Sequence, residues 1–131
     1  MNSKPKIGLS GELKFVVGPE HVIDFAEGGM PAVLSTPRLI ALLERTARET
    51  LMPLLEPGER SVGVEIELRH VAPTPLGQQV ICLARVIQAE GSRVAFHVEA
   101  RDEHETIARG YHQRQIIRVD RFAERVQRKQ R

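Results

Sequence analysis

Apolar and polar residues alternate along most of the second half of the chain. Between Ser61 and Val71, four apolar residues occupy every second position: Val62, Val64, Ile66 and Leu68. A period of two is typical of a strand that buries one face. The same pattern predicts strands over residues 79–89, 93–101 and 106–119, and a first strand over residues 12–17. Turns are expected over residues 73–77, 90–92 and 102–105.

One segment has helical spacing instead. Ser35-Thr36-Pro37 predicts a helix start, because a capping hydroxyl satisfies free N–H groups and proline in the first turn loses no hydrogen bond. We place the N-cap at Thr36 and expect the helix to run from Pro37 to about Met52. Residues 39–43 are apolar almost all round, which is typical of an enclosed helix. The broad apolar arc comprises Leu39, Leu43, Ala47, Thr50 and Leu51. Residues 18–31, rich in Gly and Pro, predict a flap or a connection with a short helix at 21–26.

The predicted order is therefore a strand, a helix and four long strands joined by successive hairpins. A helix packed on an antiparallel sheet covers one face of it. We therefore expect an α+β protein with the hotdog fold, an antiparallel β-sheet wrapped around one central α-helix. Residues 1–131 suit a single domain. Long edge strands invite pairing, so we expect a homodimer that continues the sheet.

Composition adds limits on location. The chain has one cysteine, Cys82, which excludes an internal disulfide and suits a reducing compartment. Its apolar neighbours predict core packing. There is no apolar N-terminal segment and no run near the ~20 residues that span a bilayer. We expect a cytoplasmic protein without membrane contact.

The charge is uneven although its net value is only +2. From residue 109 onward, Asp120 and Glu124 oppose eight basic residues: Arg109, Arg114, Arg118, Arg121, Arg125, Arg128, Lys129 and Arg131. We interpret this end as a solvated tail, with a short amphipathic helix over residues 120–131, although a basic end also attracts phosphates. The chain has no Trp, one Tyr and four Phe, which disfavours stacking on nucleic acid.

Two polar residues mark the predicted helix. Thr36 is an N-cap in one interpretation, and in another it lies where free N–H groups could stabilise an oxyanion. Glu44, at the border of the apolar arc, could pair with Arg48 on the surface or enter a cleft as general base or nucleophile. Eight residues separate them, about 12 Å along the axis, so they share a site only if the substrate lies along the helix.

His70 ends a predicted strand just before a Pro-rich turn, where an imidazole could act as acid, base or orienting donor. His21, His97, His104 and His112 are alternatives. Of these, His97 is expected to face outward, and His112 could line a groove. The sequence has no Gly-x-Ser-x-Gly elbow, no phosphate-binding Gly-rich loop and no clustered metal ligands, so we expect no metal.

Several segments, in the order in which they occur along the chain, resemble those of a known family. They are Ser35-Thr36-Pro37, Glu44, residues 55–59, Val62-Gly63, residues 70–77 and residues 110–114. From about Pro31 to its end, the chain is similar to the hotdog-fold thioesterases of the fluoroacetyl-CoA-specific type. The resemblance implies hydrolysis of an acyl-CoA, with Thr36, Glu44 and His70 as the catalytic set and Gly63 near the thioester. It also implies a homodimer with sites near the subunit interface, and no cofactor, because CoA is part of the substrate.

The chain departs from that family in the segment before Thr36. It is shorter here, and Glu27-Gly28-Gly29-Met30 replaces lid-forming phenylalanines, so selectivity for a fluorinated acyl group is not predicted. Met30 could still contact an acyl chain. The arginines of the last strand and tail, Arg114 among them, are candidates for the CoA phosphates. The alternative is a non-hydrolytic acyl-CoA-binding sensor or carrier; dimers could also pair into tetramers.

Overall fold

The computed structural model describes residues 1 and 3–130. One antiparallel sheet has the strand order β1-β3-β4-β5-β2. Its strands are β1 (Ser10–Val16), β2 (Glu59–His70), β3 (Gln79–Glu90), β4 (Arg93–Arg101) and β5 (Thr106–Arg118). The helices are α1 (Thr36–Leu51) and α2 (Val119–Lys129), with short 3-10 turns η1 (Pro19–His21) and η2 (Met52–Leu54).

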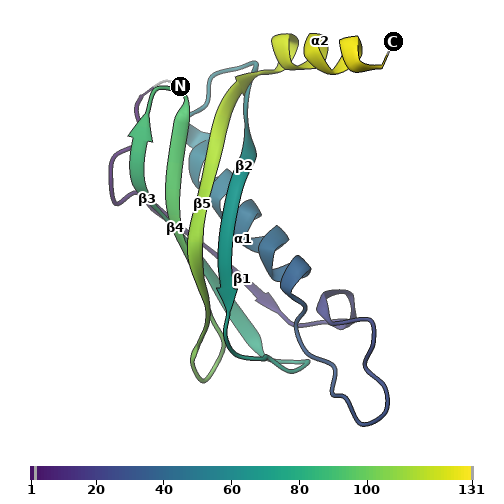
Figure 1. Ribbon diagram of the computed structural model, residues 1–131. Helices are drawn as coiled ribbons and strands as arrows, with labels where there is room; N and C mark the ends of the chain where they lie inside the picture. Colours follow the sequence, from purple (N-terminus) through teal and green to yellow (C-terminus); the bar gives the residue numbers. More distant parts are fainter. Residues whose placement is uncertain (2, 131) are drawn as a thin grey trace.

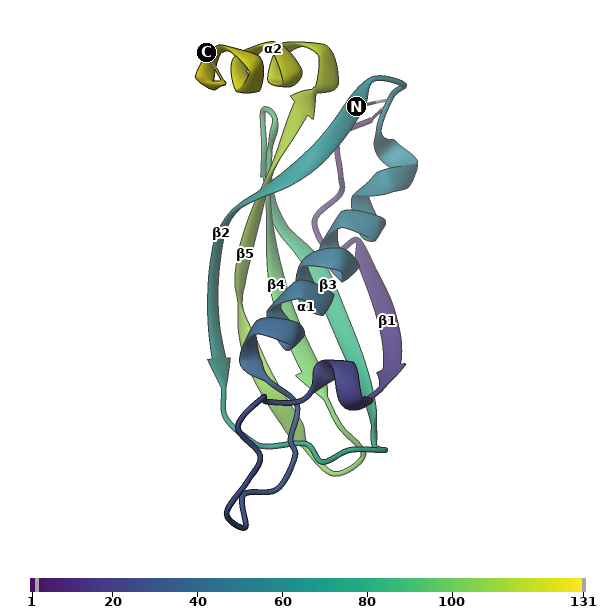
Figure 2. The same ribbon diagram turned by 90° about the vertical axis from the view of Figure 1, so that its right-hand side faces the viewer.

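Helix α1 lies diagonally across one face of the sheet, with β1 and β2 at the two edges (Figures 1 and 2). Leu39, Leu43 and Leu51 are fully buried against the sheet. They meet alternate residues of the two central strands, Val80, Cys82, Ala84 and Val86 of β3 and Val94, Phe96, Val98 and Ala100 of β4. The α+β prediction is confirmed. Ala41 is exposed, however, so in this chain the sheet covers only one side of the helix.

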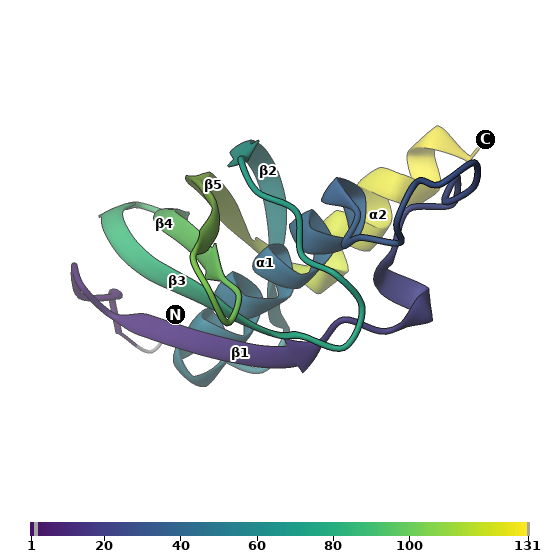
Figure 3. The ribbon, with the colours of Figure 1, turned by 90° about the horizontal axis from the view of Figure 1, so that it is seen from below.

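The prediction of successive hairpins is wrong at one connection. β2 pairs only with β5, whereas β3 pairs with β1 and β4, so the segment between β2 and β3 crosses one end of the sheet (Figure 3). Thr74 holds this segment: its carbonyl accepts from Leu34 N–H, and its hydroxyl donates to Asp102 Oδ2 at 2.9 Å. Alternation identifies a strand but not its partner, which explains the error.

The predicted alternation of β2 is interrupted by a bulge. Gly63 pairs with Arg114 and Glu65 pairs with Gln113, which leaves Val64 as the extra residue. Val64 is 44% exposed, whereas Ile66 and Leu68 are half-buried. A bulge re-aims the residues beside it. Here it turns the bare backbone of Gly63 toward α1.

Two smaller segments also test the sequence pattern. The helix expected at 21–26 is absent; η1 ends at His21, and residues 24–31 are exposed.

The predicted C-terminal helix is confirmed as α2, which extends away from the sheet beyond the edge strand β2 (Figures 1 and 2) and buries none of its residues. Among the described residues, no helix has the length and apolarity needed to cross a bilayer.

Cys82 lies in the core, as its apolar neighbours predict. Burial raises the pKa of its thiol to about 12. The thiol is therefore a packing group rather than a nucleophile.

Candidate active site

The prediction that Thr36 is the N-cap is wrong, and the Thr36 hydroxyl is therefore not used in capping the helix. Ser35 caps α1 by accepting a hydrogen bond from Arg38 N–H, while Thr36 and Pro37 are the first two helical residues. The Thr36 Oγ1 instead lies 2.7 Å from His70 Nδ1. The helix start and the end of β2 are therefore joined by one side-chain hydrogen bond.

The same cap limits which backbone donors can meet a substrate. Pro37 has no N–H, and the Arg38 N–H is engaged by Ser35. Within the part of the chain that the structure describes, only the Thr36 N–H of the first turn is left open. An oxyanion at this helix start would be met by one N–H and the Thr36 hydroxyl.

His70 is held as a neutral imidazole. Burial lowers its pKa below the usual value, and a smaller interaction with the Ala72 backbone opposes the shift. Its Nε2 atom is buried and has no hydrogen-bond partner among the described residues. A buried nitrogen without a partner is unusual in a folded protein. It is suited to meeting a water molecule or a substrate atom.

Two open cavities flank Thr36. One, of about 450 Å³, is lined by Ile23, Asp24 and Phe25; the other, of about 280 Å³, includes Val33 and His70. Met30 is 43% exposed and lines neither cavity. Sequence reasoning missed Phe25, although it is the one aromatic residue of the segment over residues 18–31.

Glu44 faces β2 rather than pairing with Arg48. Its Oε2 lies 2.8 Å from where a Cβ on Gly63 would be, and 3.8 Å from Arg114 Nη1. The Glu44 side chain is 39% exposed, so water reaches the carboxylate. The missing side chain of Gly63 makes room for this carboxylate above the bulge.

Arg114 is buried beneath Glu44. Its Nε donates to Ser61 Oγ at 2.8 Å and its Nη2 to Ser61 O at 2.8 Å, while Nη1 lies 3.1 Å from His112 Nε2. Burial lowers the pKa of Arg114, and the charge of Glu44 opposes the shift. A guanidinium satisfied by these groups is placed to hold Glu44 rather than to reach a phosphate in solvent.

His112 completes this cluster from β5. It is 1% exposed, and its Nδ1 donates to the carbonyl of Glu65 in the bulge at 2.8 Å. Nε2 is then unprotonated and accepts from Arg114. The groove-lining role that the sequence left open for His112 does not fit this burial. The sequence did contain a signal for the burial of His112. It lies two residues from Arg114, on the face of β5 that also buries Ile116.

The structure thus forms two clusters along α1 instead of one compact triad. Thr36 bonds His70 at the helix start, and Glu44 meets Gly63 and Arg114 about 12 Å further along the axis. No contact joins Glu44 to His70 among the residues that the structure describes. A substrate bridging both clusters would lie along the helix.

Gly63→Ala is expected to reduce turnover without unfolding the protein. The new Cβ would meet Glu44 Oε2 at 2.8 Å and the buried ring of His112 at 3.3 Å. The half-exposed carboxylate can move aside, and the ring needs to shift by only a few tenths of an ångström, so the cost to stability should be small. A displacement of about 1 Å at a reacting group can cost up to ~10²-fold in rate. Steady-state kinetics and thermal unfolding check this. The control variant Gly91→Ala, in the β3–β4 turn, should leave kcat unchanged, although its φ of 60° makes alanine costly to stability. An unchanged kcat in Gly63→Ala would separate Glu44 from the reaction.

Acid is expected to destabilise the fold through His112. Burial lowers the pKa of His112, and the charge of Arg114 adds to the shift, while the Glu65 carbonyl and the Glu44 charge oppose it. Below pH 6.5 the unfolded chain binds a proton that the folded chain resists, so the free energy of unfolding falls with pH. Urea denaturation at pH 7 and pH 5.5 should show a loss smaller by about 1 kcal/mol in His112→Gln. Part of the loss should persist, because the pKa of His70 is also lowered.

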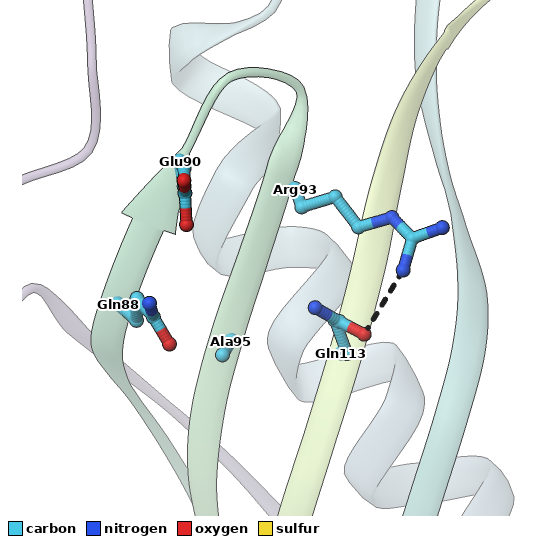
Figure 4. Close-up of a pocket in the computed structure, with 5 residues that line it drawn as sticks. All are labelled: Gln88, Glu90, Arg93, Ala95 and Gln113. Carbon is cyan, nitrogen blue, oxygen red and sulfur yellow. Dashed lines mark hydrogen bonds between the residues drawn. The ribbon is translucent and has the colours of Figure 1, made fainter.

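A further cavity lies on the sheet face away from α1 (Figure 4). There Arg93 donates to Gln113 and Gln115, with Glu90 nearby. Arg93 is paired with the two glutamines, and none of these residues belongs to either cluster on α1. No group of three or more His, Cys, Asp or Glu residues within the described chain could hold a metal ion.

The whole chain is similar to proteins of one known family. Residues 17–120 match the family model of the fluoroacetyl-CoA-specific thioesterase. The chain is 34% identical to the fluoroacetyl-CoA thioesterase of Streptantibioticus cattleyicolor, covering 98% of this chain and 97% of that protein. A crystal structure of a thioesterase superfamily member from Thermus thermophilus superposes with a TM-score of 0.89 at 30% identity, covering 99% and 96% of the two chains. A hot-dog-like protein from Thermanaerovibrio acidaminovorans gives 0.87 at 27% identity, covering 94% and 91%.

The family model covers most of the chain, and the relatives match it nearly end to end. The sheet and its helix are those of hotdog-fold thioesterases. The chain belongs to the fluoroacetyl-CoA-specific thioesterase family and is an acyl-CoA thioesterase.

Proposed function

We propose that Glu44 drives the hydrolysis of an acyl-CoA at the bare backbone of Gly63. The observation that carries this proposal is the placement of a water-accessible carboxylate over Gly63, held by buried Arg114. As general base, Glu44 removes a proton from water, whose oxygen attacks the thioester carbonyl. The C–S bond then breaks, the free acid forms, and the CoA thiolate takes up a proton. As nucleophile, Glu44 would instead attack the carbonyl and expel the CoA thiolate, which takes up a proton. Water would then hydrolyse the mixed anhydride, releasing the free acid and restoring the carboxylate.

Thr36 and His70 act on the other side of the thioester in this proposal. The Thr36 N–H and hydroxyl receive the carbonyl oxygen as it gains charge. His70 orients the Thr36 hydroxyl through the 2.7 Å contact at Nδ1. Because Glu44 takes the proton from water, the unpartnered Nε2 of His70 is left to supply a proton to the leaving sulfur.

The acyl group would enter the cavities beside Thr36, under the segment over residues 18–31. Phe25, 60% exposed in the free protein, offers the apolar surface that a bound acyl chain would cover. Met30, further along this segment, is also exposed and could close over the same chain. A variant of the fluoroacetyl-CoA thioesterase has been crystallised with acetyl-CoA, which supports a short acyl group as the first to test.

We also propose a homodimer formed through the free edge of β2. This strand pairs only with β5, and its bulge residue Val64 is 44% exposed. An unpaired edge strand is a template for a second copy. A pairing of dimers into tetramers and a cytoplasmic location remain predictions of the sequence.

The experiment is a thiol-release screen against short, branched, aromatic and long acyl-CoAs. We expect kcat/KM of at least ~10⁴ M⁻¹s⁻¹ for the preferred acyl group. Binding of an acyl-CoA by calorimetry, without thiol release from any ester, would instead make the protein a carrier or sensor.

A further inference from the structure

A large groove lies at the end of α1 opposite the flap. It has a volume of about 760 Å³ and runs between the C-terminal half of α1 and the start of β2. We call it the arginine groove, because its lining includes three arginines, against two carboxylates. The lining comprises Arg45, Arg48 and Arg60, the carboxylates Glu49 and Glu56, and the apolar Met52 and Leu55. Nothing in the chemistry proposed above uses these residues.

Two of the three guanidinium groups are open to a ligand. Arg45 is occupied by Glu49, at 2.9 Å on the same helix. Arg48 and Arg60 have no carboxylate partner among the described residues, and Arg60 Nη1 donates only to a backbone carbonyl, at 3.1 Å. A guanidinium with free N–H groups presents the planar pair of donors that matches phosphate oxygens.

The groove is continuous with the Glu44 cluster. Arg48 follows Glu44 by one helical turn on the same face of α1. Ser61, which lines the groove, accepts the hydrogen bond from Arg114 that supports Glu44. Met52 lies about 12 Å beyond Glu44 along the axis. A ligand group at Glu44 is thus joined to the groove by a path along the helix.

The distribution of charge along the molecule favours one orientation of a polyanionic ligand on this path. The flap and the β4–β5 turn are both at the end of the molecule away from the groove (Figures 1 and 2). They carry Glu20, Asp24, Glu27, Asp102, Glu103 and Glu105. The basic helix α2 lies at the groove end. A polyanionic group is repelled by the acidic end and attracted to the basic end.

We propose that the arginine groove binds the phosphate groups of the CoA part of the substrate, through Arg48 and Arg60. The inference rests on the proposed function for the position of the thioester at Glu44. The pantetheine arm then runs over the C-terminal half of α1, and the acyl chain points toward the flap. The phosphate site is thereby the groove, not the exposed arginines of α2.

The test compares a complete CoA ester with the same acyl group on N-acetylcysteamine, which carries no phosphate. In Arg48→Gln/Arg60→Gln, KM for the CoA ester should rise by about 10-fold or more, while kcat stays within about twofold. Hydrolysis of the N-acetylcysteamine thioester should not change. Calorimetry with free CoA should show the same weakening of Kd, and this readout does not depend on hydrolysis.

Two control variants make the assignment specific. Arg93→Gln removes an arginine from the cavity on the other sheet face, and Arg121→Gln/Arg125→Gln removes two from α2. Both should keep KM and Kd for CoA within about twofold, because the long-range attraction of α2 is screened by salt and is small beside direct contacts to phosphate. The proposal is overturned if Arg48→Gln/Arg60→Gln binds CoA normally, if the α2 variant loses binding instead, or if the truncated thioester is affected equally. A wild-type protein that binds CoA through these arginines but hydrolyses no thioester would refute the proposed function and leave the phosphate site standing.

Discussion

Glu44→Gln should lower kcat by at least ~10²-fold and leave the fold intact. The amide keeps the shape of the side chain and its place beside Arg114, but it cannot take a proton from water or attack a carbonyl. Because the position over Gly63 is preserved, KM should change little. Thiol release measured over a range of substrate concentrations gives both constants, and thermal unfolding confirms the fold.

The matched control is Glu49→Gln, which lies on the same helix and pairs with Arg45 at the surface. Loss of this ion pair should cost under ~1 kcal/mol of stability, and kcat should stay within about twofold of the wild-type value. Wild-type turnover in Glu44→Gln would remove the carboxylate from the mechanism. Rapid acid quenching then separates the two roles: an acylated peptide that contains Glu44 identifies a nucleophile, and its absence in an active enzyme favours a general base.

The sequence predicts the elements well because their signals are local. Alternation over residues 79–89, 93–101 and 106–119 matches β3, β4 and β5 to within one residue at each end. The sequence places the N-cap of α1 at Thr36, one residue after the observed cap at Ser35. Both residues carry a hydroxyl group that can cap a helix, so local signals do not separate them. That single step changes the chemistry, because it leaves the Thr36 hydroxyl free for His70.

What the sequence could not predict depends on contacts between distant segments. Ser61 and Arg114 are 53 residues apart, and Glu65 and His112 are 47 apart, yet these pairs form the support beneath Glu44. The bulge that brings them into register breaks the alternation that identified β2. An alternating pattern reports which face is buried only while the pairing is regular.

His70→Ala should also lower kcat by at least ~10²-fold, and a second variant shows why. His70→Asn can retain a hydrogen bond to Thr36 in place of Nδ1 but cannot carry a proton through Nε2. If His70 only orients Thr36, Asn should restore most of the lost activity; if it handles a proton, Asn should be as impaired as Ala. The exposed His104→Asn should behave like the wild type. Turnover at the wild-type rate in His70→Ala would exclude both roles.

The pH dependence supplies the final test of His70. Burial lowers its pKa, so the imidazole is neutral at pH 7 and gains a proton only below its usual value of 6.5. Activity that needs the neutral form should therefore be constant near pH 7 and fall as the pH drops through the lowered pKa. This acid limb should disappear from the residual activity of His70→Asn. It should persist in His112→Gln, because His112 contacts Arg114 and not Thr36. An acid limb unchanged in His70→Asn would assign the titration to another group, and the carboxylate of Glu44 would be the next to test.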